Sequence, residues 1–582
     1  MMTPDELEAL VRSGHSLDGA TIALFDLRGR TLVGARMARA KLRAVVLSRA
    51  DLSGADLSGA QLLGCPLEEA NLTGCNLQGA IILDGKLRGA LLRGADLRGA
   101  RLVRADLSGA DLSGADLRGA ALLGAHLAGA RLTGAQVEGV RLDQANLAGA
   151  DLAGARLVKA VLTRADLSGA VLRDATMTGA VLYRAKLVGA DLTGATVDKT
   201  VLAEADLTGA KLPRTLTSTL LVGAKIGPAA LAGKDLQRSD LDGAPLQGAD
   251  LSGANLTGSS LRGVDLRGAD LKGAVLERTD LAGSNLEGAR LEGATLQFCQ
   301  LREANLRGVD LSGRPLAYSA FSKADLSGAK LRGAQVERSV FDGASFEGAD
   351  LTRAAFRSCV LREARLGGAT LDRATFEGTD FGAADLRGLP IKGLRIVRCG
   401  FRGANLREMD LSGGDFTDCN FDGADLTQAN LEGAVLVRTK WQGAKLELAI
   451  LRSASAKCAY FIGAAMRGAK LGGAMLRYAV FAGADLRFTD LTRADLRNTV
   501  FHRALAEGAL LTGASLGFSD MAHADLTRAE VTGADFDHAV LHLVEDAGVL
   551  WGTARASNAR RDDRERIAAE AFVPPPPRTR AR

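Results

Sequence analysis

Three of the six histidines could bind a metal ion, because they recur at a nearly regular spacing close to the C-terminus. His502, His523 and His542 lie about 20 residues apart, and the imidazole nitrogen is a common ligand of zinc and related ions. The same spacing also fits histidines that face solvent from successive layers of a repetitive structure, and this is the interpretation we favour. The sequence therefore indicates a candidate metal site, but it requires no metal and no cofactor.

The other groups that could do chemistry fit a structural role better than a catalytic one. The aspartates that precede apolar residues are expected to be solvated, on an open surface where nothing shifts a carboxyl pKa for acid–base work. The glycines belong to turns and do not form a phosphate loop. Six of the seven cysteines stand where the sequence otherwise places Ala, as a small apolar thiol can: Cys65, Cys75, Cys299, Cys359, Cys399 and Cys419. We expect no enzyme.

A five-residue repeat positions all of these side chains. From Leu17 onward, nearly every fifth residue is a large apolar one and the residue two before it is usually Ala, so that residues 50–60 read ADLSGADLSGA. A period of five matches neither the 3.6 of a helix nor the 2 of a straight strand, and recurrent Gly opposes a long helix. The chain must therefore turn at every repeat and form a stacked fold.

This repeat resembles that of the pentapeptide-repeat family, whose unit is A-(D/N)-L-x-x, as in residues 105–109. The resemblance covers roughly residues 15–543. It implies an all-β fold, a right-handed quadrilateral β-helix with one pentapeptide on each side and 20 residues in each coil. With about 26 coils at about 4.8 Å each, the solenoid would be a rod of roughly 125 Å.

Large aromatic residues test the 20-residue coil independently of the resemblance. Positions that stack on one another share an environment, so they should share residue types. Large aromatic residues recur every 20 residues and form the predicted structural core column: Phe321, Phe341, Phe381, Phe401, Phe421, Trp441, Phe461, Phe481 and Phe501. Leu361 occupies the one position of this series that is not aromatic. We expect these side chains to form a single column inside one side of the solenoid.

The repeat also predicts where the chain divides. The step from Leu212 to Leu216 is four residues instead of five, and Pro213 cannot donate to an interior ladder. We therefore predict one β-helix segment over residues 15–212, a register break over residues 213–235 and a second segment over residues 236–543.

Both ends of a solenoid need a cover, because an open end exposes unpaired strand groups. Thr3, Pro4 and Glu6 form an N-cap, a first-turn proline and a capping-box partner, so residues 1–14 are predicted to form a capping helix. Residues 544–582 are predicted to form a C-terminal cap, with a charged helix near residues 558–572, and a flexible tail rich in Pro and Arg.

The charge balance limits the possible partners. Lys and Arg total 73 against 68 Asp and Glu, with a net charge of +5, and both signs alternate along the chain. This argues against a large field of one sign, whether a basic nucleic-acid groove or an acidic imitation of DNA. The sequence shows neither a signal-peptide pattern nor a membrane span, so we expect a cytoplasmic protein and leave non-classical secretion open.

Two outward rows are candidate protein-binding surfaces. An apolar row, which could equally be scattered surface residues of a β-rich face, comprises Ile81, Leu83, Val103, Leu123, Val161, Val181, Tyr183 and Val201. A second row replaces corner glycines with Arg or aromatic residues, types that are common at binding hot spots, and substitutions that accommodate a different turn would explain it as well. Its members are Arg278, Phe298, Tyr318, Arg338, Arg398, Arg438, Tyr478 and Phe518.

We rank three functional hypotheses. The first is a non-catalytic, rod-like scaffold, adaptor or secreted effector that binds a protein partner. The second follows from the part of the family that resembles quinolone-resistance proteins, which interact with DNA gyrase by imitating duplex DNA; the slightly basic charge argues against it. The third is a nucleic-acid binder that would use the Arg and aromatic corner row.

Overall fold

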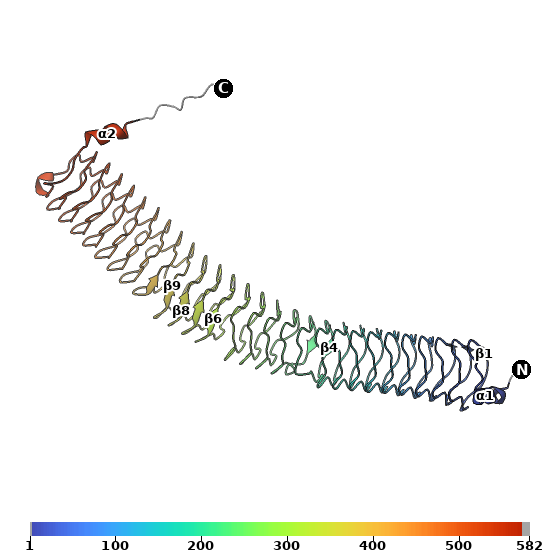
Figure 1. Ribbon diagram of the computed structural model, residues 1–582. Coiled ribbons are helices and arrows are strands. Elements are labelled where there is room, and N and C mark those ends of the chain that lie inside the picture. The colour runs from blue at the N-terminus through green and yellow to red at the C-terminus, as the bar shows by residue number, and fades with distance from the viewer. Residues whose placement is uncertain (1–2, 573–582) are drawn as a thin grey trace, which may run out of the picture. The chain divides into compact units, whose positions relative to one another are not determined.

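The computed structural model describes residues 3–572, which divide after residue 305 into two compact units, called here the first and the second unit. Each unit is a parallel β-helix in which residues 20 positions apart lie side by side (Figure 1). In the first unit, for example, Asp96 pairs with Asp116 and Asp116 pairs with Gln136. The predicted all-β quadrilateral solenoid is confirmed.

Helices and strands are few and short, because most sides of the coils pair through single residues. The first unit contains helix α1 (Pro4–Arg12) and strands β1 (Thr21–Ala23), β2 (Lys41–Arg43), β3 (Gln61–Leu63), β4 (Asp206–Leu207) and β5 (Lys225–Ile226). The second contains β6 (Pro315–Ala317), β7 (Gln335–Glu337), β8 (Ala355–Arg357), β9 (Thr375–Glu377), β10 (Arg395–Val397), a 3-10 helix (Trp551–Thr553) and α2 (Arg564–Glu570). These strands form three parallel sheets, β1-β2-β3, β4-β5 and β6-β7-β8-β9-β10, and successive strands pair within each sheet.

One repeat shows why the sequence produces this fold. Leu107 points inward and is fully buried, its N–H donates to the His126 carbonyl of the next coil at 2.7 Å, and its carbonyl accepts from Ala110 N–H at 3.0 Å, which closes the turn. The Asp106 carboxylate accepts from Ser108 N–H at 3.0 Å. The Asp of each A-D-L-S-G unit therefore stabilises the corner, as Asx turns do.

The predicted aromatic column lies inside the second unit as a buried stack of nearly parallel rings. Phe401 and Phe421 have centroids 4.7 Å apart, and Phe421 and Trp441 have centroids 4.2 Å apart. The Trp441 indole N–H donates to the Thr439 hydroxyl at 2.7 Å, so burial of the indole does not leave its N–H unpaired.

The first unit contains one coil that is a residue short. Val201 pairs with Leu220, and Asp206 in β4 pairs with Lys225 in β5, so these partners are 19 residues apart instead of 20. The missing residue falls beside Pro213. This is the region of the predicted register break over residues 213–235, and the division of the solenoid there stays a prediction.

Helix α1 covers the start of the first unit as predicted. The Thr3 hydroxyl accepts from Glu6 N–H and the Glu6 carboxylate accepts from Thr3 N–H, which completes the capping box. Leu7 and Val11 are buried. The Glu8 carboxylate also accepts from the N–H of Thr31, at 3.4 Å, and so satisfies a strand-edge donor of the first coils.

At the other end, coil pairing extends further than the repeat itself. Val540 pairs with Arg560 and Asp535 pairs with Arg555, because the backbone ladder can continue without a large central residue. The Trp551 ring packs on Phe536 with centroids 5.1 Å apart. Helix α2 follows within the expected charged segment, and the Pro-rich and Arg-rich tail from Pro574 onward lies outside the described residues. No helix in residues 3–572 has the length and apolar character needed to cross a membrane.

Candidate interaction surfaces

The predicted apolar row of the first unit lies on one side of its coils, in two adjacent outward columns. The 20-residue coil stacks Leu83, Val103 and Leu123 in one column, while Ile81 stands in the other, where it pairs with Gln61 of β3. Leu123 is exposed and the other three are half-buried. Leu63, which the sequence analysis missed, begins the same column and is 39% exposed.

A charged pair divides this row into two patches. Arg141 and Asp143 stand where the apolar residues would continue, with their side chains 3.4 Å apart. We call the first part the Leu patch: Leu63, Ile81, Leu83, Val103 and Leu123. Beyond the interruption lies the Val patch: Val161, Val181, Tyr183, Val201 and the previously unrecognised Leu220, which is 42% exposed.

Tyr183 in the Val patch already has partners within the chain. Its hydroxyl donates to the Glu204 carboxylate at 3.0 Å, and the Arg184 guanidinium lies 5.0 Å from its ring centre. Arg184 also donates to Glu204 at 2.6 Å. The Val patch is therefore bordered by a closed polar network. The Leu patch has charged neighbours as well, because the exposed Arg101 pairs with Ile81 in the adjacent column and Arg104 forms an ion pair with Asp84 at 2.8 Å.

The corner residues adopt left-handed backbone conformations. In the first unit, Arg278 has a φ of 56° and its guanidinium lies 5.7 Å from the centre of the Phe298 ring, which is 41% exposed. Side chains at such φ values stand outward from the turn, where glycine is otherwise preferred. The corner position thus explains why the row is exposed, and it does not by itself indicate a ligand.

In the second unit, the corner arginines are engaged by neighbouring side chains. Arg338 donates to the Tyr318 hydroxyl at 2.8 Å. Arg438 binds Asp418 through two nitrogens, at 2.6 and 2.8 Å, and Arg398 pairs with Glu377. Because these guanidinium groups already have partners within the chain, the row does not present a line of free cations to phosphates.

The aromatic corner residues further along are more exposed. Tyr478 is 54% exposed and Phe518 is 61% exposed, and the Phe518 ring stacks on His538 with centroids 4.7 Å apart. Tyr460 and Ile462, which the sequence analysis did not select, line a surface hollow of about 460 Å³ together with three polar residues. The sequence alone could have indicated Tyr460 and Ile462, because both occupy outward positions of the repeat that are usually polar.

The shifted pKa values of carboxylates and thiols do not favour acid–base or nucleophilic catalysis. The Thr193 hydroxyl and the Arg173 guanidinium hold the pKa of Asp191 well below its usual range. Burial raises the pKa of the Cys75 and Cys299 thiols to about 12. A carboxylate that stays ionised and a thiol that stays protonated suit a structural role.

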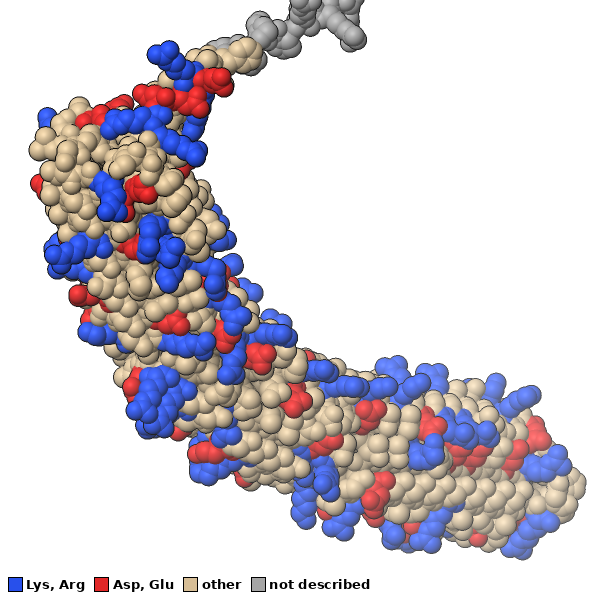
Figure 2. Space-filling model, turned by 60° about the vertical axis from the view of Figure 1, so that its left-hand side comes forward, with Lys and Arg blue, Asp and Glu red and all other residues tan. Residues whose placement is uncertain are grey.

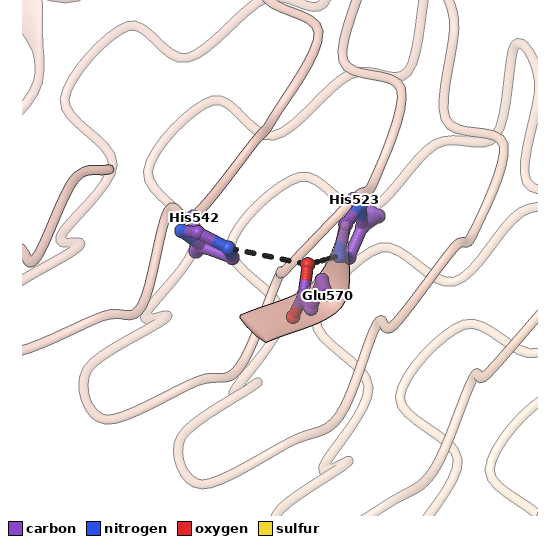
Figure 3. Close-up of side chains that lie close together, drawn as sticks. All are labelled: His523, His542 and Glu570. Atoms are coloured by element: carbon purple, nitrogen blue, oxygen red, sulfur yellow. Dashed lines mark ion pairs between the residues drawn. The ribbon is translucent and has the colours of Figure 1, made fainter. Parts of the chain in front are cut away.

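The structure brings two of the three predicted histidines to a carboxylate on α2. His523 Nε2 lies 3.0 Å from Glu570 Oε2, and His542 Nε2 lies 3.5 Å from the same oxygen (Figure 3). His502 lies beside this cluster, with its ring edge-on to His523 at a centroid distance of 5.4 Å. Glu570 carried no sequence signal, because it lies outside the repeat.

Comparison with protein families identifies the repeat. The family model described as pentapeptide repeats matches segments that together cover most of the chain between residues 26 and 542. The chain belongs to the pentapeptide-repeat family. A comparison with curated protein sequences gave no match.

Solved structures of the same family resemble parts of the chain. HetL, a pentapeptide repeat protein involved in heterocyst differentiation regulation from the cyanobacterium Nostoc, is 28% identical, with 52% of this chain and 98% of HetL covered and a TM-score of 0.18. QnrB1, a plasmid-mediated fluoroquinolone resistance protein, is 18% identical, with 34% of this chain and 97% of that chain covered and a TM-score of 0.20.

Proposed function

We propose that this pentapeptide-repeat protein is a non-catalytic interaction protein that binds a protein partner through the Leu patch of its first unit. The observation that carries the proposal is the column Leu63, Leu83, Val103 and Leu123, in which four successive coils place a large apolar side chain at an outward position that is mostly polar elsewhere. A contiguous apolar patch on a soluble surface is typical of an interface.

The spacing of the column indicates what kind of partner surface fits. Successive coils are about 4.8 Å apart, close to the 5.4 Å rise of one helical turn. An amphipathic helix of about three turns could therefore place its i, i+4, i+7 and i+11 residues against the four side chains. Ile81, in the adjacent column, would widen the contact.

The charged surface supports a protein partner over nucleic acid or an imitation of DNA. On the faces that Figure 2 shows, Asp and Glu lie scattered among the Lys and Arg of each unit, so that neither sign covers a face by itself. Ion pairs such as Arg104 with Asp84, at 2.8 Å, and Arg438 with Asp418, at 2.6 Å, link successive coils. Phosphate binding needs unpaired cations, and imitation of DNA needs unpaired anions.

Site-specific photo-crosslinking in the source cells tests this proposal. A photoreactive phenylalanine analogue at Val103 should give one discrete covalent adduct, and the double variant L83D/L123D should abolish it. The control T73D/Q78D adds the same charges at exposed positions away from the patch and should leave the adduct unchanged. An adduct that persists in L83D/L123D, or no adduct at all, would refute the proposal.

A further inference from the structure

We propose that His523, His542 and Glu570 form a binding site for a divalent transition-metal ion of the zinc type, which fastens helix α2 to the coils at the end of the second unit. This inference is independent of the function proposed for the Leu patch. It concerns residues that lie in two adjacent coils and in α2, and it assigns a role to a helix that otherwise contributes little packing.

The spacing of the three groups fits one ion. A tetrahedral ion with bonds of about 2.0–2.1 Å to nitrogen and oxygen holds its ligand atoms roughly 3.3 Å from one another. Glu570 Oε2 lies 3.0 Å from His523 Nε2 and 3.5 Å from His542 Nε2. All three ligand atoms lie within 4.8 Å of one another, so closing the site requires only small side-chain movements.

His542 is the strongest indication of a ligand. Its side chain is 2% exposed, and within the described residues its Nε2 forms no hydrogen bond and has only the 3.5 Å contact to the Glu570 carboxylate that it faces (Figure 3). A buried nitrogen without a hydrogen bond is costly, whereas coordination of a metal ion would satisfy it. His523 and Glu570 remain partly exposed, so an ion can enter from solvent and a water molecule can occupy the fourth position.

The opposite nitrogen of His542 couples the site to the start of α2. The N–H of Asp563, the N-cap residue, donates to His542 Nδ1 at 3.2 Å, which leaves the proton of a neutral ring on Nε2. An ion bound at Nε2 requires the proton to move to Nδ1, and the Asp563 contact must then open. Metal binding should therefore shift the first turn of α2 while it anchors the last turn through Glu570.

Helix α2 needs such an anchor. None of its residues is buried, so apolar packing does not hold it on the solenoid. Its hydrogen bonds are local, such as the Arg566 guanidinium to Glu570 at 2.8 Å, apart from the histidine cluster and the Asp563 contact. An ion that joins Glu570 to two adjacent coils would convert a weakly held helix into a fixed cover of the solenoid end.

Titration of the full-length, metal-free protein with Co²⁺, and with Zn²⁺ in competition, tests the site. One equivalent of Co²⁺ should give the intense visible absorption of a tetrahedral nitrogen and oxygen site, and Zn²⁺ should abolish it. H523Q and E570Q should each weaken binding at least tenfold. The control H538Q alters an exposed histidine that pairs with Asp537 outside the cluster and should bind normally.

Hydrogen exchange supplies the structural readout. Zn²⁺ should slow exchange of the amides in the last turn of α2 at least tenfold in the unaltered protein and in H538Q, but not in E570Q. The proposal fails if no one-to-one Co²⁺ complex forms, if H523Q and E570Q bind as tightly as H538Q, or if Zn²⁺ binds without protecting α2.

Discussion

The indole of Trp441 stacks on the ring of Phe421 at a centroid distance of 4.2 Å and an angle of 8° between the planes. Both side chains are fully buried, and they belong to successive coils. Because one coil supports the next through such contacts, loss of a single ring should affect the stability of the second unit well beyond its own coil.

Removal of the Trp441 indole should therefore destabilise the second unit by a predictable amount. Trp441→Ala should lower the free energy of unfolding of the second unit by about 3–5 kcal/mol, since it leaves a large cavity and removes the indole partner of the Thr439 hydroxyl. Phe488→Ala, at a corner residue that is 51% exposed, should change it by less than about 1 kcal/mol. Urea unfolding followed by circular dichroism measures both. Equal effects of the two variants would contradict the buried-column account.

Corner glycines should differ in their tolerance of a side chain. A Cβ at Gly508 would lie 2.8 Å from Phe488 Cδ1, whereas a Cβ at Gly533 would meet nothing within 4 Å, although both residues have similar positive φ values. Gly533→Ala should cost about 1–2 kcal/mol from the left-handed backbone alone, and Gly508→Ala should cost more. Thermal unfolding of the two variants side by side checks the order, and the reverse order would contradict the close approach of Phe488 to Gly508.

The cysteines should react very unevenly with alkylating reagents. Burial raises the pKa of the Cys359 thiol to about 11 and that of Cys75 to about 12, and thiolates are the reactive form. Only Cys458 among the seven is not buried. Iodoacetamide at pH 8 should therefore label Cys458 in the folded protein and all seven cysteines in guanidinium. Rapid labelling of Cys75 under native conditions would show that the interior is open.

The pH dependence of stability should include a contribution from Asp191. Its carboxylate accepts from the Thr193 hydroxyl at 2.6 Å and from Arg173 at 2.7 Å, and these partners lower its pKa in the folded state. A lowered folded pKa means that the stabilisation is fully present above the unfolded value of about 3.9 and is lost as the pH falls below it.

The variant Asp191→Asn should consequently lower the melting temperature at pH 7, and the difference from the unaltered protein should shrink as the pH falls below about 4. Arg173→Met should have a similar effect, and the double variant should lose less than the sum of the two single variants. Thermal unfolding from pH 7 to pH 3 provides the measurement. A difference that stays constant over this range would show that the pKa of Asp191 does not change on folding.

Much of the fold could be predicted from the sequence because each residue of a pentapeptide has one environment. The positions of Phe401 and Trp441 in a single column, and the helical cap that begins at Thr3, followed from spacing and capping chemistry alone. A 20-residue period determines which residues stack, so inward and outward positions needed no further information.

Features that depend on side-chain contacts outside this period could not be predicted. Arg438 was a candidate binding residue of the corner row in the sequence, but it binds Asp418 of the preceding coil. Glu570 joins the histidine cluster because α2 folds back on the coils, a tertiary contact that no repeat specifies. Leu63 and Leu220 escaped notice for a different reason: they lie at the borders of the apolar row, where the pattern is weakest.

Footprinting of side chains by hydroxyl radicals, in the absence and in the presence of the partner that photo-crosslinking identifies, tests the interaction surface most directly. The account predicts that partner binding reduces the oxidation of Leu83 and Leu123 at least threefold, while Tyr478 and Phe518, exposed in the second unit, change little. Unchanged oxidation of Leu83 and Leu123 with strong protection of Tyr478 and Phe518 would contradict it and move the interface to the second unit.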